Sequence, residues 1–445
     1  MKEVTLEEQT SEPAVACRAK TPSPKLVSTS AVYLLTNVLN AAIPFALLPV
    51  LTRYLSPAEY GRVAMFQTLV GAIGAVIGVG MAAALTRKYY EPDLSSPDAR
   101  DFLGACVQLL VIVSLIVLAL LLPFSSPLGG FLGLDAKWIP WAIPVAMGSV
   151  LIQIRLTMWQ VRGRAASYGA FQVGQSVSNV VLSLLFVTVL LLGAAGRITA
   201  QSLSVVVFAA AGLLVLRRDG AISLLSWRPQ FLKELIAYGV PLIPHVLSAF
   251  VLFSIDRVVI TTELGLTNAG IYVVAAQLAG VVSLLFDAVG KAYTPWLFEC
   301  LARGDETERA RVVRSTYAWF LLFLVGAGVA FLVGPPIVVM IAGERYAGGG
   351  EVLGWLVLGQ CFMGMYALLS NYLMYAKRTG VLSLVTVVSA SVYLLLLLIL
   401  VRMLGLKGAA IAYAAGMAFR LGATWWAAHR CEPMPWFALL APRRC

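Results

Sequence analysis

The sequence predicts an all-α integral membrane protein with twelve transmembrane helices, arranged in two six-helix bundles that are related by a parallel internal repeat. Three observations predict this fold class: the composition, the length of the apolar runs and a set of repeated motifs. Of the 445 residues, 60% are hydrophobic and 12% are charged, with a mean hydropathy of +0.86. Soluble domains carry about 25% charged residues. The apolar runs reach about 20 residues, which is the length that spans a bilayer.

Apolar runs bounded by charged residues or by Gly and Pro clusters predict the spans. They cover residues 27–52, 62–86, 102–122, 138–160, 168–192, 197–216, 234–257, 268–290, 315–341, 351–376, 380–401 and 405–428. The domains that follow are a disordered cytoplasmic tail (1–26), an N-terminal six-helix bundle (27–216), a cytoplasmic linker (217–233), a C-terminal six-helix bundle (234–428) and a cytoplasmic C-terminal tail (429–445). Residues 291–314 are expected to form the longest loop.

The orientation follows from the positions of the basic residues. Connecting segments on one side hold 23 of the 33 Lys and Arg residues, and those on the other side hold 8. Cytoplasmic loops are enriched in Lys and Arg. We therefore expect a multi-pass protein with both termini in the cytoplasm. The same distribution accounts for the net charge of +11, so we expect no nucleic-acid partner.

Three matched stretches indicate an internal repeat. The stretch Gly193-x-x-Gly196-x-x-x-Ala200 recurs 212 residues later from Gly405 to Ala412. The segments before these spans, 160–164 and 374–378, also match, and Gly61 corresponds to Gly270, 209 residues later. Six spans per repeat give both halves the same orientation, which is typical of transporters with a substrate path between the halves.

Arginines and amides within the spans are candidate substrate-binding residues. Arg53, Arg155 and Arg420 carry charge without an equal number of carboxylates at matching depth. A charge at the membrane centre costs about 2.5–3.5 kcal/mol on insertion scales, and the planar arginine fork suits phosphate. The alternative is that these side chains extend to the lipid headgroups. Gln153 and Asn179 could bind sugar hydroxyls or hydrogen-bond between helices.

Five residues are candidates for gating or coupling. Asp287 and Lys291 are four apart on one helix face, as an inner-gate ion pair or an interfacial pair would be. Asp256 and Arg257 end the seventh span; adjacent residues diverge by about 100°, so we expect them to pair with other helices, in an outer gate or a stabilising network. His245 lies between two prolines and either couples proton movement or bonds a freed carbonyl.

Enzyme and metal signatures are missing from the sequence. The six cysteines are scattered without a C-x-x-C pair, which predicts neither a metal site nor disulfides. The polar segments contain no Gly-rich phosphate loop, H-E-x-x-H or nucleophile elbow. A membrane enzyme of polysaccharide assembly, the less favoured alternative, would need a large polar loop. We expect a non-enzyme without cofactors, apart from coupling to H⁺ or Na⁺.

Several motifs in fixed order resemble one family. They are the stretches Ala42–Gly61, Tyr238–His245, Ser254–Arg257, Ala269–Tyr272 and Ala292–Leu297. Together they are similar to the polysaccharide-transport family, the O-antigen and lipid-linked oligosaccharide flippases of the multidrug/oligosaccharidyl-lipid/polysaccharide exporter superfamily. The resemblance implies two six-helix bundles in a V around a cationic cavity.

The resemblance also implies a function. It is the translocation of undecaprenyl-diphosphate-linked oligosaccharide, an O-antigen or exopolysaccharide repeat unit, across the bacterial inner membrane by alternating access. The partners implied are membrane lipids, this lipid-linked substrate and a polysaccharide polymerase. A cation-coupled multidrug exporter of the same superfamily ranks second. Such exporters usually carry an acidic cation site in the first bundle, whereas spans one to six hold no acid deep inside.

Overall fold

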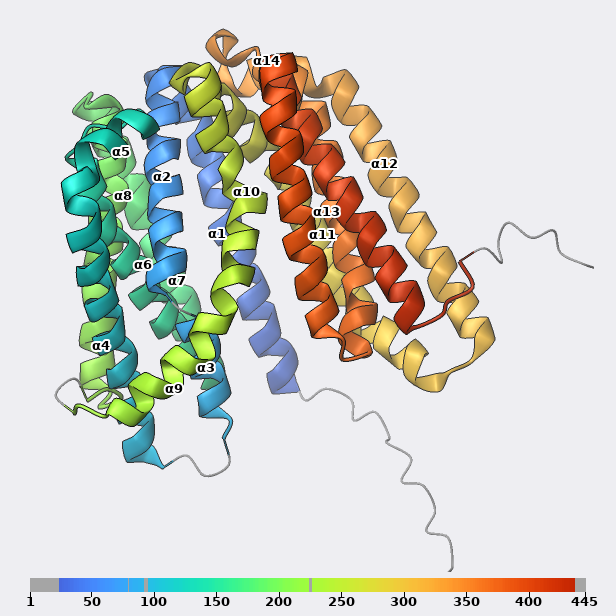
Figure 1. The fold of residues 1–445 in the computed structure, drawn as a ribbon, viewed down its shortest axis with the longest axis horizontal. Helices are drawn as coiled ribbons and strands as arrows, with labels where there is room; N and C mark the ends of the chain where they lie inside the picture. The colour runs from blue at the N-terminus through green and yellow to red at the C-terminus, as the bar shows by residue number, and fades with distance from the viewer. Residues whose placement is uncertain (1–23, 79, 92–94, 224–225, 437–445) are drawn as a thin grey trace, which may run out of the picture.

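The computed structural model describes residues 24–78, 80–91, 95–223 and 226–436, and this part is almost entirely helical (Figure 1). The helices in the first half are α1 (Pro24–Tyr54), α2 (Pro57–Ile77), α3 (Met81–Tyr89), α4 (Ser96–Leu121), η1 (Leu122–Phe124), α5 (Ser125–Leu132), α6 (Trp138–Val161), α7 (Ala165–Leu184), η2 (Leu185–Val189) and α8 (Gly193–Arg218). Those in the second half are α9 (Pro229–Gly239), η3 (Val240–Leu242), α10 (Ile243–Leu264), α11 (Leu266–Arg303), α12 (Glu306–Ala342), η4 (Glu344–Tyr346), α13 (Gly349–Tyr375) and α14 (Thr379–Cys431). Most of the expected tail 1–26 lies outside the described residues.

The all-helical membrane class is confirmed, but the number of spans is not. Within the described residues, nine helices are long and apolar enough to cross a bilayer, and the bent pair α9–α10 raises the number to ten. The apolar part of α1 that meets this test, Val38–Tyr54, is shorter than a span. Length and hydropathy alone therefore support fewer crossings than the twelve expected from the sequence.

The longest helix, α14, is a hairpin of two antiparallel arms. A straight helix of its 53 residues would be about 80 Å long. Gly405 has non-helical angles (φ 59°, ψ −138°), and Tyr393 and Tyr413 on either side of it pack ring to ring at 6.2 Å. A Cβ atom on Gly408 would lie 1.9 Å from the carbonyl oxygen of Leu400, so the reversal requires glycine there.

The apolar core divides into two clusters, which define two lobes. The N-lobe comprises α2–α9 and the C-lobe comprises α10–α14, and Figure 1 shows them side by side with α1 between them. Helix α1 packs along α7, while Leu47, Leu48 and Leu51 join the core of the C-lobe. In the text below, the lower end is the end at which α1 begins in Figure 1, and the upper end is the opposite one.

Helix α9 packs on the N-lobe, although the sequence placed its second half at the start of the C-terminal bundle. Phe231 packs edge to face on Phe102 of α4 at 5.7 Å, and Glu234 accepts a 3.1 Å hydrogen bond from Lys88 of α3. The predicted seventh span is bent by 52°. Pro241 lies at this bend, where its ring and missing N–H interrupt the helix.

The two lobes meet closely at the upper end, where α2 crosses α11. A Cβ atom on Gly61 would lie 2.1 Å from the carbonyl oxygen of Leu266, and one on Gly270 would lie 1.9 Å from that of Pro57. Gly61 and Gly270 are 209 residues apart, as are Pro57 and Leu266. The crossing is therefore self-complementary, as contacts about a two-fold axis are. Tyr346 also donates a 2.9 Å hydrogen bond to the carbonyl oxygen of Leu55.

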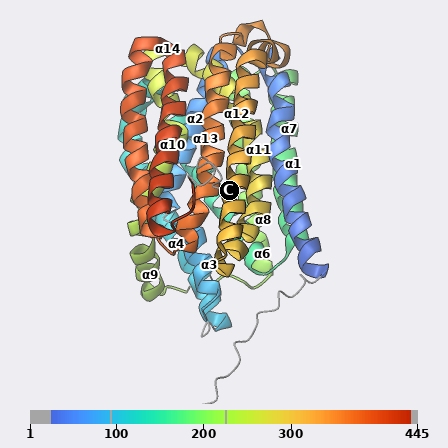
Figure 2. The same ribbon diagram turned by 90° about the vertical axis from the view of Figure 1, so that its right-hand side faces the viewer.

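The lower end of the C-lobe is more helical than expected. Helices α11 and α12 continue through the predicted loop 291–314 and meet at Gly304, whose φ of +70° forms the turn (Figure 2). The start of the expected C-terminal tail is also packed. Trp436 is 1% exposed, and its carbonyl oxygen accepts a 2.9 Å hydrogen bond from the Tyr317 hydroxyl.

Candidate functional site

Arg197 is a buried arginine near the start of helix α8. Helix α8 begins at Gly193 (φ +57°), so Arg197 lies in its second turn and not at the first residue of the span, where the sequence placed it. The residue is 8% exposed, and Nη1 donates to Asn179 Oδ1 (2.7 Å) and Ser183 Oγ (2.6 Å). Its Nε has no partner, and no carboxylate of the described residues forms an ion pair with it. A buried charge of this kind is costly unless an anion compensates it.

The space beside Arg197 is a polar cavity of about 270 Å³ between the lobes. Its walls come from α1, α2, α7, α8 and α11. Gln67 donates to Gln201 across it at 2.8 Å, and the Tyr60 hydroxyl donates to Gln277 of the C-lobe, also at 2.8 Å. A guanidinium among amides and a hydroxyl can bind phosphate oxygens and sugar hydroxyls.

The sequence predicted that Arg155 would be an unpaired charge within the membrane, but the structure shows it in an ion pair. It is 1% exposed, its Nη2 forms a 2.7 Å ion pair with Asp219, and its guanidinium lies 3.9 Å from the centre of the Trp159 ring. Asp219 caps the end of α8 and is 64 residues further along the chain, so the local sequence around Arg155 gives no sign of it. This correction removes Arg155 from the set of free cations.

Arg420 is a second buried guanidinium without a carboxylate partner in the described part of the chain. It lies on the second arm of α14 and is 6% exposed. Its guanidinium stacks 3.8 Å from the centre of the Tyr366 ring, and Nη2 donates to the Tyr366 hydroxyl at 2.9 Å. Its Nε has no partner. Arg420 is not part of the cavity wall beside Arg197, so the two charges occupy different lobes.

The other predicted substrate-binding residues are distributed differently. Asn179 lies in the cavity and bonds Arg197, which brings it together with the charge. Arg53 and Gln153 are exposed, and neither lines this cavity. Arg197 itself was missed as a candidate, because the sixth span was expected to begin at residue 197. The matched glycines Gly193 and Gly405 were the available signal for an earlier start.

Asp256 and Arg257 line a smaller cavity of about 170 Å³ inside the C-lobe, together with Tyr272, Gln360 and Tyr413. Asp256 is 6% exposed, and its Oδ1 lies 3.6 Å from Arg257 Nη1. The two neighbours therefore pair with each other, which the sequence had not led us to expect. Asp256 Oδ1 accepts a 2.8 Å hydrogen bond from the backbone N–H of Arg257, which turns the carboxylate toward it.

Three gating candidates remain predictions. His245 lies on α10 and Asp287 on α11, but their side chains are outside the described part of the structure. Lys291 is exposed near the lower end of α11. The inner-gate pair Asp287–Lys291 is therefore neither supported nor contradicted by the geometry.

Residues 26–301 match the family model described as polysaccharide biosynthesis protein, which covers more than half of the chain. The chain belongs to this family. Among related members, the Lsg locus protein 1 of Haemophilus influenzae is 25% identical over 83% of this chain and 90% of its own length. The succinoglycan biosynthesis transport protein ExoT of Rhizobium meliloti is 24% identical over 76% of this chain and 66% of its own length.

Two solved structures share the fold of this member of the polysaccharide biosynthesis protein family. The lipid II flippase MurJ in an inward closed conformation aligns with a TM-score of 0.72 at 12% identity, over 90% of this chain and 87% of its own. An inward-facing multidrug transporter of the MATE family, from the MOP superfamily, aligns with a TM-score of 0.67 at 18% identity, over 91% of this chain and 98% of its own. These likenesses show that this member of the polysaccharide biosynthesis protein family shares its fold with both structures, and its long apolar helices make it a multi-pass membrane protein.

Proposed function

We propose that this protein is a flippase for undecaprenyl-diphosphate-linked oligosaccharide, an O-antigen or exopolysaccharide repeat unit, and that it works by alternating access between its two lobes. The observation that carries the proposal is Arg197: a buried guanidinium that has no carboxylate partner among the described residues and faces a polar cavity to which both lobes contribute. A diphosphate offers the bidentate oxygens that such a guanidinium binds best. The amides around it suit the sugar attached to the diphosphate.

We infer twelve crossings in two related bundles. The ten spans supported by length and hydropathy become twelve when the two arms of α14 are counted separately and the whole of α1 is included. The matched turns support the repeat, because Gly193 and Gly405 share a positive φ, 57° and 59°. The self-complementary crossing of Gly61 and Gly270 supports a two-fold axis along the membrane normal.

A further pair of matched helix ends supports the same repeat. After α6 the N–H of Arg164 donates to the carbonyl oxygen of Trp159 at 2.8 Å, and after α13 that of Arg378 donates to Leu373 at 2.9 Å. The residue before each arginine has a positive φ: 65° at Gly163 and 55° at Lys377. Gly163 and Lys377 are 214 residues apart, close to the spacing of the other matched positions.

The proposed orientation places the lower end in the cytoplasm, with both termini. The lobes touch at the upper end, and no ion pair of the described residues joins α2–α9 to α10–α14. A conformation in which the lobes touch only at the upper end would admit the diphosphate and glycan from the cytoplasm, while the lipid tail stays in the bilayer. Arg420 supplies positive charge in the C-lobe, Asp256 binds the coupling H⁺ or Na⁺, and a polysaccharide polymerase would act on the product.

Translocation of a lipid-linked oligosaccharide in proteoliposomes tests the proposal. Arg197→Ala and Arg420→Ala should each slow translocation by about ten- to a hundred-fold, since a hydrogen bond to a charged group contributes about 1.5–3 kcal/mol. Arg345→Ala, which removes an exposed arginine, is the matched control and should translocate normally. Normal rates for both buried-arginine variants would overturn the proposed role of the positive charges.

The cation-coupled multidrug exporter remains the second candidate, favoured by Asp256. A buried carboxylate beside a cavity that Tyr272 also lines could bind a cation. An exporter should lower the accumulation of cationic dyes in cells, fail with Asp256→Asn and keep working with Arg197→Ala. A flippase should depend on Arg197, whether or not it transports dyes.

A further inference from the structure

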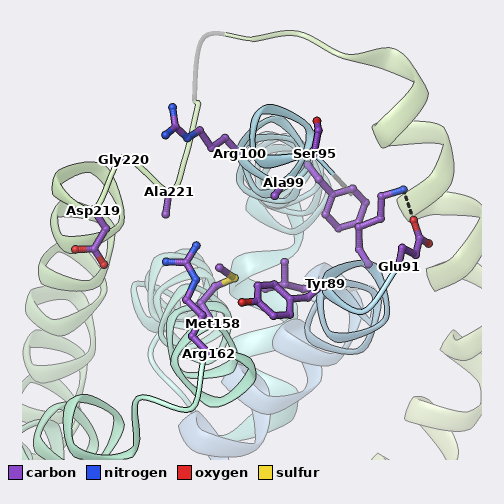
Figure 3. Close-up of a pocket in the computed structure, with 13 residues that line it drawn as sticks. Tyr89, Glu91, Ser95, Ala99, Arg100, Met158, Arg162, Asp219, Gly220 and Ala221 are labelled. Atoms are coloured by element: carbon purple, nitrogen blue, oxygen red, sulfur yellow. Dashed lines mark ion pairs between the residues drawn. The ribbon is translucent and has the colours of Figure 1, made fainter. Parts of the chain in front are cut away.

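A pocket of about 440 Å³ lies among the lower ends of N-lobe helices, away from the cavity between the lobes (Figure 3). Its walls come from α3, α4, α6 and the segment after α8. Figure 3 shows Tyr89 of α3 and Met158 and Arg162 of α6 directed toward one space, with Arg100 of α4 beyond it. Pockets of this size hold small organic molecules or lipid headgroups.

The walls of the pocket are fixed by close backbone packing. Gly220, with φ +59°, turns the chain after α8, and the N–H of Ser223 donates to the carbonyl oxygen of Arg100 at 3.3 Å. A Cβ atom on Gly104 of α4 would lie 2.0 Å from the carbonyl oxygen of Ser223. The segment is thus held against α4 and closes one side of the pocket.

The carboxylates around the pocket already have partners. Glu91 and Glu234 both bond Lys88, at 2.9 and 3.1 Å. Asp219 pairs with Arg155 at 2.7 Å. Asp101, one residue beyond Arg100, pairs with Arg228 at 3.0 Å.

Two arginines that line the pocket have no carboxylate partner. In the described part of the chain neither Arg100 nor Arg162 takes part in an ion pair. Their side chains are exposed and partly exposed, respectively, so both guanidiniums can reach a ligand. Leu85, Phe102 and Met158 provide apolar walls beside this charge.

We infer that this pocket is a binding site for a phosphate-bearing ligand, with Arg100 and Arg162 as the phosphate contacts and Tyr89 beside them. A guanidinium fork binds phosphate oxygens bidentately, and two forks on different helices select a group of fixed size. The phosphate belongs to an anionic phospholipid headgroup or to a soluble phosphate ester. The site is separate from the passage between the lobes and does not depend on which substrate is translocated.

Thermal melting of the purified full-length protein tests this site. One arm titrates glycerol 3-phosphate into the protein in phosphatidylcholine nanodiscs, and the other replaces part of the phosphatidylcholine by phosphatidylglycerol. The wild type should melt at a higher temperature in at least one arm. The double variant Arg100→Gln/Arg162→Gln should need at least about ten-fold more ligand for the same rise.

The matched control removes two other arginines nearby. Arg164→Gln/Arg218→Gln takes away the same charge from exposed positions outside the pocket and should respond as the wild type does. Ala99→Trp keeps both pocket arginines but fills the space, and should also lose the response. A response only to phosphatidylglycerol identifies a lipid headgroup, and one to glycerol 3-phosphate a soluble ester. No wild-type response in either arm, or equal losses in the pocket and control pairs, would overturn the inference.

Discussion

Alanine substitution at the α2–α11 crossing should push the upper ends of the lobes apart. A methyl group on Gly61 or on Gly270 would lie 2.1 or 1.9 Å from a backbone carbonyl oxygen. Ordinary contact starts near 3.4 Å, so the backbones must separate by about 1.3–1.5 Å. Neither carbonyl can rotate away, because each belongs to a helix.

The magnitude follows from the cost of overpacking. Inserting a methyl group into a closely packed contact costs about 1–3 kcal/mol. Because the crossing exists only while the upper ends are joined, this cost should shift the equilibrium between conformations by about 5- to 150-fold. The double variant Gly61→Ala/Gly270→Ala should cost less than the sum of the single ones, since both methyl groups open the same contact.

Spin labels at Leu191 and Met403, 70% and 72% exposed at the upper ends of the two lobes, report the separation as a distance distribution. Gly61→Ala and Gly270→Ala should populate a longer distance. Gly74→Ala on α2 and Gly290→Ala on α11 are the controls, because a methyl group at either position meets nothing within 4 Å. Identical distance distributions in all four variants would refute the reasoning.

Three further predictions concern buried polar and aromatic groups. Arg155→Ala should destabilise the protein by about 1–3 kcal/mol by leaving the partly exposed Asp219 without its cation, and denaturant unfolding in detergent should show partial recovery in the double variant with Asp219→Asn. Asp256→Asn should abolish the dependence of translocation on an ion gradient; an unchanged dependence removes Asp256 from coupling. Trp436→Ala should release the segment after α14 at a cost of about 3–5 kcal/mol, which limited proteolysis detects as faster cleavage near the C-terminus.

The sequence predicted the helices well, but it predicted poorly which helices and side chains contact one another. Long apolar runs identified helical segments because bilayer length sets their size. The helical continuation of α11 and α12 through 291–314 was missed, since charged residues there resemble a loop although Asp305 caps the second helix. Hydropathy could not reveal that α9 packs on the N-lobe, because that depends on contacts of Phe231 and Glu234 with distant helices.

The candidate site shows the same limit. Asn179 was identified from its residue type, and the structure places it against Arg197. Arg155 was expected to be free because its partner, Asp219, follows 64 residues later. Depth in the membrane was also predicted poorly: starting span six at residue 197, four residues after the start of α8, put Arg197 at the very end of the span. Pairing and depth are properties of the assembled bundle, so one-dimensional patterns indicate the composition of a polar site better than its geometry.

The attachment of α9 to the N-lobe would constrain the movement of the two lobes in the proposed alternating access. Because α9 is fixed to α3 and α4, the covalent connection to α10 passes through the three residues of η3, Val240–Leu242. Rotation of one lobe against the other must then be absorbed by the backbone torsions of this short joint. Pro241 restricts one of those torsions, so a few bonds far from the cavity beside Arg197 would largely set the angular range of that motion.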